Sequence, residues 1–328
     1  MEVEAKYWKV TGDSKVECLL CPHHCTLSNG QVGLCRGRKN IGGKMYAINY
    51  GEVVSIAMDP IEKKPLYHFH PGLPILSIAP NTCNMRCPHC QNYVISQKVV
   101  PTEYISPEDM VEIAVQNNSS GIAYTYTEPL TWFEYLLDVA RLAKERGLYN
   151  VLVTNGLIEE EPLQELLPFV DAMNVDLKSM DREYYAQVLG GDLDTVLRTI
   201  TISHEIALVE VTNLVIPTQN DSPELIHKLI DWVADLDPEI PLHFSKYFPH
   251  WKVSFPPTPA STLEWAYEEA RKKLSYVYVG NVEIPGASNT FCPDCGNLLV
   301  ERRYFYARVV GLDGRKCREC GREINIVL

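Results

Sequence analysis

Eleven cysteines stand in three groups along the 328-residue chain, with spacings typical of metal ligands. The groups are Cys18, Cys21, Cys25 and Cys35, then Cys83, Cys87 and Cys90, then Cys292, Cys295, Cys317 and Cys320. An odd total leaves one thiol over in any complete disulfide framework. The first residues lack the basic and apolar pattern of a signal peptide, which predicts a compartment where thiols stay reduced. We therefore interpret all three groups as metal sites.

The middle group has the spacing Cys83-x3-Cys87-x2-Cys90 and follows a short apolar run. A [4Fe–4S] cluster is normally held by four thiolates, so three leave one iron with an open position. An open position is typical of a reactive metal site rather than a structural one. The alternatives are a zinc knuckle completed by His89 or three buried, unligated thiols.

The two outer groups each offer four thiolates. Cys292-x2-Cys295 and Cys317-x2-Cys320, 21 residues apart, predict a zinc ribbon, with a rubredoxin-like iron as the alternative. The N-terminal spacing is Cys18-x2-Cys21-x3-Cys25-x9-Cys35. This set suits zinc or an auxiliary iron–sulfur cluster equally well, and disulfides are a third possibility.

Six short apolar runs between residues 75 and 244 have the length of buried strands. They are Ile75–Ala79, Gly121–Thr125, Asn150–Val153, Ala172–Val175, Leu208–Val215 and Pro241–Phe244. Helical patterns lie between several of them, two of which begin after the N-cap serines Ser106 and Ser222. This alternation predicts an α/β protein with a partial (β/α)6 TIM-like barrel. We expect a Cys-rich extension over 1–72, the barrel over 73–288 and a zinc-ribbon-like tail over 289–328.

Polar residues follow the predicted strands, on the side where the ligand sites of β/α folds gather. The candidates are Thr127, Glu128, Asn155, Asp176, Lys178 and Asn213, with His243 on the sixth strand. Taken singly, each has an ordinary structural explanation, such as a turn, a strand end or a core histidine. Their recurrence after successive strands predicts one shared site.

The Cys83–Cys90 motif at the end of the first strand resembles the signature of the radical S-adenosylmethionine (SAM) superfamily. The resemblance implies a [4Fe–4S] cluster whose open iron binds SAM. It further implies an oxidoreductase that cleaves SAM reductively to a 5′-deoxyadenosyl radical, which abstracts hydrogen from a substrate. An electron donor of the ferredoxin or flavodoxin type is implied as a partner.

The later motifs extend the resemblance. Thr127 and Glu128 occupy the place of the superfamily's Gly-Gly-Glu motif, with its glycines replaced. Thr154-Asn155-Gly156 and Asp176-Leu-Lys178 resemble motifs of glycyl-radical activating enzymes. The stretch from Asn213 to Asp221 resembles another segment of that group, with Thr218 in place of a glycine. The resemblance implies that these residues contact SAM, with Lys178 near its carboxylate.

Three further segments resemble a narrower group, the AmmeMemoRadiSam-system radical SAM enzymes, which are similar to pyruvate formate-lyase activating enzymes. They are Asp59–Gly72, Cys90–Gln97 and Tyr276–Asn281. This resemblance implies an activase-like reaction on a partner protein. It also implies Memo-type and companion proteins as partners, and it leaves the substrate open.

The composition narrows the alternatives. A net charge of −12, from 30 basic and 42 acidic residues, disfavours a broad nucleic-acid surface. The longest uncharged stretch, Leu73–Met85, is too short to span a bilayer, so we expect a cytoplasmic protein without a membrane partner. A non-catalytic zinc or iron–sulfur scaffold is the alternative function. A simple electron carrier is disfavoured because carriers close all four iron positions.

Overall fold

A nine-stranded sheet forms the centre of the computed structural model, which describes residues 3–12 and 14–328. The strand order is β15-β14-β13-β12-β11-β10-β8-β7-β9. Seven strands run parallel: β8 (Pro74–Pro80), β10 (Gly121–Tyr124), β11 (Tyr149–Thr154), β12 (Ala172–Asp176), β13 (Leu208–Val215), β14 (Leu242–Lys246) and β15 (Val277–Gly280). Strands such as β10, buried at every position, are continuous apolar runs because both faces of a parallel sheet are covered.

The predicted barrel strands are all present, and the sheet extends beyond them at both edges. β15 adds a seventh parallel strand, which the expected sixfold pattern did not include. At the other edge β7 (Glu52–Pro60) pairs antiparallel with β8, and β9 (Glu103–Tyr104) pairs with β7. The predicted extension over 1–72 thus contributes a strand to the central sheet, while the three-domain division itself stays a prediction.

Helices that connect the parallel strands pack against the sheet. The α-helices are α1 (Tyr93–Ser96), α2 (Pro107–Gln116), α3 (Phe133–Glu145), α4 (Glu160–Leu166), α5 (Leu193–His204), α6 (Pro223–Leu236) and α7 (Ala260–Ala270). Of these, α2, α3, α5 and α7 contact the strands of the sheet, and α4 and α6 contact α5 and α7, respectively. Shorter helical turns are η1 (Ile61–Lys63), η2 (Pro129–Trp132), η3 (Leu167–Phe169) and the π-helical η4 (Tyr184–Leu189). The predicted caps are confirmed, since Ser106 and Ser222 accept from the backbone of α2 and α6.

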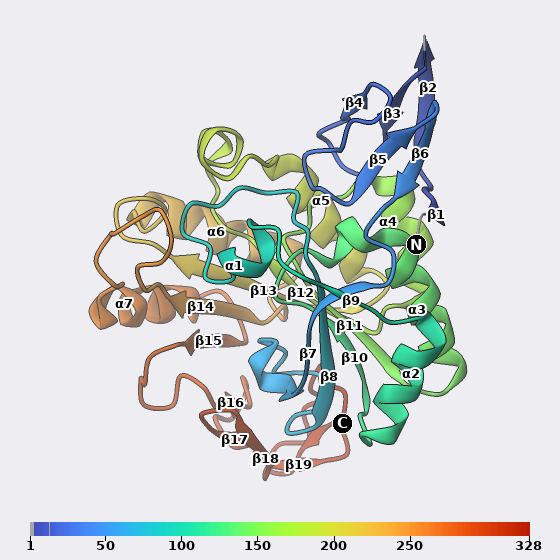
Figure 1. Cartoon of the computed structure of the whole chain (residues 1–328). Helices are drawn as coiled ribbons and strands as arrows, with labels where there is room; N and C mark the ends of the chain where they lie inside the picture. The colour runs from blue at the N-terminus through green and yellow to red at the C-terminus, as the bar shows by residue number, and fades with distance from the viewer. Residues whose placement is uncertain (1–2, 13) are drawn as a thin grey trace.

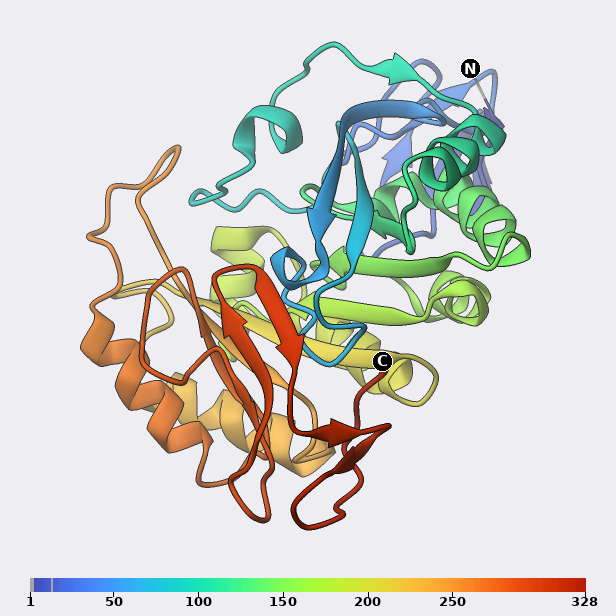
Figure 2. The ribbon, with the colours of Figure 1, turned by 90° about the horizontal axis from the view of Figure 1, so that it is seen from below.

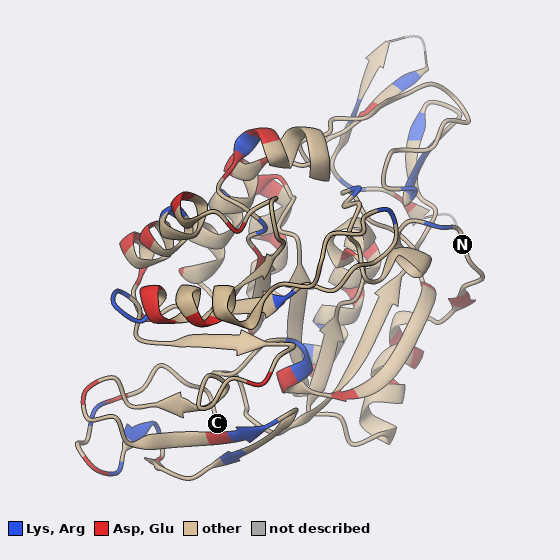
Figure 3. Ribbon diagram, turned by 90° about the vertical axis from the view of Figure 1, so that its left-hand side faces the viewer, with Lys and Arg blue, Asp and Glu red and all other residues tan. Residues whose placement is uncertain are grey.

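The outer helices are amphipathic. In α6, Ile226, Leu229, Ile230 and Val233 are buried at the 3–4 spacing of a core-facing stripe. Figure 3 shows basic and acidic residues side by side on the outer helices, while the strands behind them carry few. Burial of the apolar stripes against the sheet therefore holds the helical layer in place and leaves the other face of the sheet to line a cavity.

Two small modules lie at opposite ends of the molecule, as Figure 1 shows. The N-terminal module has the sheets β2-β3-β4 and β1-β6-β5. Its strands are β1 (Val3–Glu4), β2 (Trp8–Gly12), β3 (Lys15–Cys18), β4 (Thr26–Leu27), β5 (Arg38–Ile41) and β6 (Lys44–Ala47). The C-terminal strands are β16 (Thr290–Phe291), β17 (Leu298–Arg303), β18 (Tyr306–Val309), β19 (Leu312–Asp313) and β20 (Lys316–Cys317).

The C-terminal tail packs between the two edges of the parallel sheet, as the view from below shows (Figure 2). Arg302 donates to the carbonyl of Tyr67 at 2.5 Å, on the segment that precedes β8. On the other side, Thr290 lies 2.9 Å from the hydroxyl of Tyr278 in β15. Hydrogen bonds also join Val327 to the backbone of His68 and His70. The tail therefore closes the side of the molecule that the open sheet leaves uncovered.

Within the described residues, no helix is both long and apolar enough to cross a membrane.

Candidate active site

A cavity of about 910 Å³ opens at the carboxyl ends of the parallel strands. Its wall has two parts. The cysteine side comes from the ends of β11 and β12 and from the segments that follow β8, β10, β11 and β12, and includes Cys83, Cys87, Cys90, Thr127, Glu128, Asn155, Asp176 and Lys178. The tail side comes from η1, β13, β14 and the tail, and includes Glu62, Thr212, His243, Arg302, Tyr304 and Phe305. The volume is in the range of small-molecule and cofactor sites.

The three central cysteines share the cavity wall, as the sequence predicted they would share a site. The backbone N–H of Met85 donates to Cys83 Sγ at 3.4 Å, and Cys90 Sγ lies 3.2 Å from the hydroxyl of Ser96. Burial raises the pKa of Cys87 to about 11, against the lowering effect of the Lys178 ammonium, and burial also raises the pKa of Cys83 well above its usual value. Such thiols become thiolates only when a metal replaces the proton.

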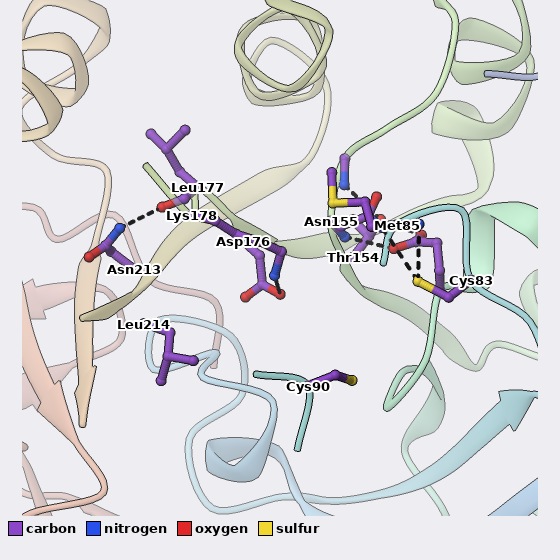
Figure 4. A network of polar contacts seen from close by, with 12 residues as sticks. Cys83, Met85, Cys90, Thr154, Asn155, Asp176, Leu177, Lys178, Asn213 and Leu214 are labelled. Carbon is purple, nitrogen blue, oxygen red and sulfur yellow. Dashed lines mark hydrogen bonds and ion pairs between the residues drawn. The ribbon is translucent and has the colours of Figure 1, made fainter. Parts of the chain in front are cut away.

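Asn84 and Asn155 hold the cysteine loop against the end of β11. Asn155 Nδ2 donates to Asn84 Oδ1 at 3.0 Å and lies 3.9 Å from Cys83 Sγ. Asn84 Nδ2 in turn donates to the carbonyl of Leu157 at 2.8 Å. Figure 4 shows Thr154 and Asn155 beside Cys83. The loop is therefore positioned by side-chain amides from the neighbouring strand.

Glu128 is buried and accepts three hydrogen bonds from the chain. Thr154 Oγ1 and the N–H of Leu130 donate to Oε1 at 2.6 and 3.1 Å, and the N–H of Asn155 donates to Oε2 at 2.8 Å. Burial raises the pKa of Glu128 to about 7, because desolvation outweighs these donors. A carboxylate accepts about four hydrogen bonds, so one acceptor position at Oε2 is left toward the cavity.

The turn before Glu128 contains a strained residue. Tyr126 has φ of +65°, a conformation that costs a non-glycine residue about 1 kcal/mol or more. Its hydroxyl donates to Asp59, its ring lies 4.3 Å from Lys64 Nζ, and its carbonyl accepts from Asn92 at 2.7 Å. Tyr126 precedes Thr127 where the superfamily's glycines were expected, so the backbone keeps a glycine-like conformation without the glycine.

Asp176 and Lys178 form an ion pair of 2.7 Å at the end of β12. Burial lowers the pKa of Lys178, but the carboxylate of Asp176 and the nearby Cys87 outweigh it and raise the pKa overall. Only 17% of the Lys178 side chain is exposed. The N–H of Lys178 donates to Tyr185 Oη at 2.9 Å, which fixes the turn that carries it. A permanently charged ammonium therefore stands beside the cysteine loop.

The structure does not bring Asn213 to the cavity. Its neighbours Thr212 and Leu214 line the wall, and alternation along β13 turns Asn213 the other way. Asn213 Nδ2 donates to the carbonyl of Leu177 at 2.7 Å, as Figure 4 shows. The predicted contact between Asn213 and a cofactor thus finds no support in its position.

His243 lines the cavity on the tail side. Its Nε2 lies 2.6 Å from Glu210, and its ring packs edge-on against Tyr67. Its assignment to SAM binding stays a prediction, because the contacts in the structure are those of a buried wall residue.

The tail side carries polar atoms without partners among the described residues. Glu62 Oε2 and Thr212 Oγ1 have no hydrogen-bond partner there, and Arg302 Nε has only its 3.6 Å ion-pair contact with Glu62 Oε1. Burial raises the pKa of Glu62, although the Arg302 guanidinium 3.6 Å away opposes that shift. Unpartnered buried polar groups cost roughly 1–3 kcal/mol each, so this wall has hydrogen-bonding capacity for a bound group.

The four tail cysteines form a compact tetrad. Cys292 and Cys320 lie 3.5 Å apart between sulfurs, Cys295 and Cys317 lie 3.7 Å apart, and all four sulfurs are within 4.8 Å of one another. A tetrahedral metal with Zn–S distances of about 2.3 Å separates its sulfurs by about 3.8 Å. The tetrad therefore fits one tetrahedral metal ion.

Several wall residues were not among the predicted ones. Ser96, Tyr126, Thr212 and Arg302 stand in loops, in a strained turn, on a strand and in the tail. A period-2 count along β13 would have selected Thr212 instead of Asn213. Nothing in the local sequence pattern around Arg302 indicates that the tail packs against the central sheet and lines the cavity.

Comparison with known proteins identifies the class. Residues 77–230 match the model of the radical SAM superfamily. An uncharacterized protein of Methanocaldococcus jannaschii is 45% identical over 334 residues, covering 99% of each chain. The chain belongs to the radical SAM superfamily, and the predicted membership is confirmed.

Two characterised relatives match over part of their length. The 4-hydroxyphenylacetate decarboxylase activating enzyme of Clostridium scatologenes is 28% identical over 151 residues, 44% of this chain and 48% of the relative. The pyruvate formate-lyase 1-activating enzyme of Escherichia coli is 25% identical over 162 residues, 47% of this chain and 66% of the relative. The chain thus has activating enzymes among its relatives, matched over half to two thirds of their length.

The cavity wall fits the superfamily's cofactors. Three thiols face the cavity, and thiolates are the ligands that iron–sulfur clusters take. Lys178 offers a cation to an anionic group, and Glu128 retains one acceptor position for a cationic one. Both charges lie on the same wall as the cysteines, so a zwitterionic cofactor fits there.

Proposed function

We propose that this protein cleaves SAM reductively at a [4Fe–4S] cluster held by Cys83, Cys87 and Cys90, and uses the resulting radical to abstract hydrogen from a substrate. The observation that carries the proposal is the wall shared by these cysteines, Glu128 and Lys178 around one cavity. When bound, the cluster supplies the electron that breaks a carbon–sulfur bond of SAM and yields the 5′-deoxyadenosyl radical.

The chain's own residues bind and orient SAM. Lys178, held by Asp176, binds the methionine carboxylate, because a compact ammonium suits a carboxylate in a desolvated site. Glu128 accepts from the methionine ammonium at the free position of Oε2, and its ionised form suits that role. Asn155 and Thr127 position the loops on either side: Asn155 contacts the cysteine loop, and Thr127 donates to Pro80 at 2.7 Å.

The substrate is proposed to be a partner protein, as for activating enzymes. The cavity reaches the surface at the tip of the β17–β18 hairpin, where Tyr304 is 76% and Phe305 48% exposed. Exposed aromatics at a cavity mouth suit a peptide loop, since they bury large apolar area at little entropic cost. Memo-type and companion proteins remain candidate partners through the resemblance of the sequence.

The tail tetrad is proposed to hold zinc, which needs no open position because all four corners are thiolates. A donor of the ferredoxin or flavodoxin type supplies the electron. We place the enzyme in the cytoplasm, where thiols remain reduced until they bind metal.

The test is anaerobic reconstitution with iron and sulfide, followed by reduction in the presence of SAM. The expected product is 5′-deoxyadenosine. An intact cluster absorption without that product would overturn the proposal in favour of a non-catalytic scaffold. Incubation with deuterated candidate proteins then identifies the substrate by transfer of label into 5′-deoxyadenosine.

A further inference from the structure

The N-terminal cysteines surround a second, smaller cavity. Cys18, Cys21, Cys25 and Cys35 all line it, and its volume is about 20 Å³. They come from the end of β3 and from the loops on either side of β4, which fold the chain back on itself. Half of the remaining wall is leucine, namely Leu20, Leu27, Leu34, Leu130 and Leu157, and the rest is Gly33 with the polar residues His23, Arg38, Asn84 and Thr131.

The size of this cavity distinguishes the N-terminal four-cysteine site from the one in the tail. A cavity of roughly 10–15 Å³ holds one water molecule, so the N-terminal thiols stand around a space larger than one water. The tail sulfurs, by contrast, approach to 3.5 and 3.7 Å, as around a single tetrahedral ion. A lone zinc ion would leave the N-terminal space partly empty. We propose that the N-terminal tetrad holds a second [4Fe–4S] cluster, closed by four thiolates.

The wall suits a buried anionic cluster better than water. A buried water needs two to four polar partners, and the leucines supply none, while His23 and Asn84 are already bonded to each other. Two donors instead point at sulfur: Arg38 Nη1 lies 3.7 Å from Cys18 Sγ, and the N–H of Gly37 lies 3.4 Å from Cys35 Sγ. Arg38 is only 1% exposed. Hydrogen bonds to cluster sulfurs and a nearby cation stabilise the negative charge of a thiolate-bound cluster.

The second site adjoins the central cysteine loop. Asn84, which follows Cys83, lines the small cavity, and its carbonyl lies 2.7 Å from a ring nitrogen of His23. His23 stands between Cys21 and Cys25. The two cysteine groups are thus joined through one histidine and one asparagine. Resting on the proposed function, the second cluster accepts one electron from the ferredoxin- or flavodoxin-type donor and passes it to the central cluster, with no bond made or broken.

The experiment separates the sites by variant. The full chain carrying Cys83→Ala, Cys87→Ala and Cys90→Ala is reconstituted anaerobically with iron and sulfide, and iron, sulfide and zinc are counted. The expected result is about four irons per chain, with an electron paramagnetic resonance signal after dithionite reduction. Cys295→Ala in the same background is the matched control, which loses zinc and keeps that iron.

When Cys21→Ala and Cys25→Ala are added to the central-site variant, loss of the remaining iron supports the assignment of a cluster to the N-terminal tetrad. A central-site variant that holds no iron and about two zinc ions per chain overturns it. Should the Cys21 and Cys25 variants fail to fold, the iron count and the signal of the folded central-site variant decide alone. Because that variant lacks the central cluster by design, the outcome does not depend on whether the wild-type chain cleaves SAM.

Discussion

The two sides of the large cavity are built differently. On the cysteine side, Asn155 donates to Glu128 and to Asn84, and Lys178 is paired with Asp176. On the tail side, Glu62 and Thr212 leave buried polar atoms without hydrogen-bond partners among the described residues. The cysteine side is the more fully hydrogen-bonded wall, with Tyr184 Oη as an unpartnered atom in the segment after β12.

This difference separates two tasks. A preorganised wall suits a cofactor that binds the same way in every turnover, because its donors and charges need no rearrangement. Spare polar atoms suit a substrate, whose own groups satisfy them on binding. Variants of the cysteine side should therefore affect the cleavage of SAM itself, and variants of the tail side only what happens to the substrate.

The largest effect is expected from Cys87→Ala. Loss of one of three cluster ligands should reduce 5′-deoxyadenosine formation to background and remove iron from the central site, while the tail metal stays. The measurement is product formation alongside metal analysis. Cys320→Ala is the matched control, because Cys320 is an exposed ligand of the tail tetrad, and it should keep the reaction. Retention of full iron content by Cys87→Ala would contradict the site.

Lys178→Met should weaken SAM binding by roughly 10- to 100-fold, which corresponds to a lost charge-assisted hydrogen bond of about 1.5–3 kcal/mol. The measurement is equilibrium binding of SAM to the reconstituted enzyme. Lys178→Arg should recover part of the affinity through its charge. Lys246→Met, which removes an ammonium that lies over the ring of Phe248, serves as control and should leave binding unchanged.

Glu128 gives the cysteine side a pH dependence. Its pKa is about 7 in the folded chain and about 4.5 when unfolded, so the folded state binds the extra proton between these values. The contribution of Glu128 to the free energy of unfolding should thus be largest below pH 4.5 and fall by about 3 kcal/mol as the pH rises from 4.5 through 7. Urea unfolding of the metal-free chain at several pH values measures this, and Glu128→Gln should flatten the decrease. An equal decrease in the variant would assign it to other groups.

The smallest effect is expected from Thr212→Val on the tail side. The change keeps the shape and removes a hydroxyl that has no partner, so stability should stay within about 1 kcal/mol. Cleavage of SAM without substrate should change by less than about twofold, while label transfer from a substrate should fall. A loss of uncoupled cleavage as large as that of Lys178→Met would abolish the distinction between the two walls.

Much of the cysteine side follows from the sequence. The apolar runs located six of the seven parallel strands, and the polar residues directly after them reached the cavity because parallel strands share one carboxyl edge. Asn213 is the exception, because it lies within β13, where side chains alternate between the two faces, and its side chain faces away from the cavity. Position after a strand is thus a good guide in a loop and a poor one within the strand.

The tail side of the cavity could not be predicted from the sequence in the same way. Arg302 reaches the cavity through contacts with Tyr67 and Glu62, more than 230 residues earlier in the chain. No local periodicity encodes such a long-range contact, which depends on how the tail packs against the open sheet. Likewise Tyr126 holds a glycine-like φ only because Asp59, Lys64 and Asn92 anchor it from elsewhere.

Because the C-terminal tail closes one side of the cavity, the cavity wall is completed only at the end of synthesis. During synthesis the parallel strands and the cysteine loop emerge first, and Arg302, Tyr304 and Phe305 follow only with the last part of the chain. Until then the cavity lacks its tail side and is open to solvent. The tail with its four cysteines therefore completes the cavity wall as the last step in the synthesis of the chain.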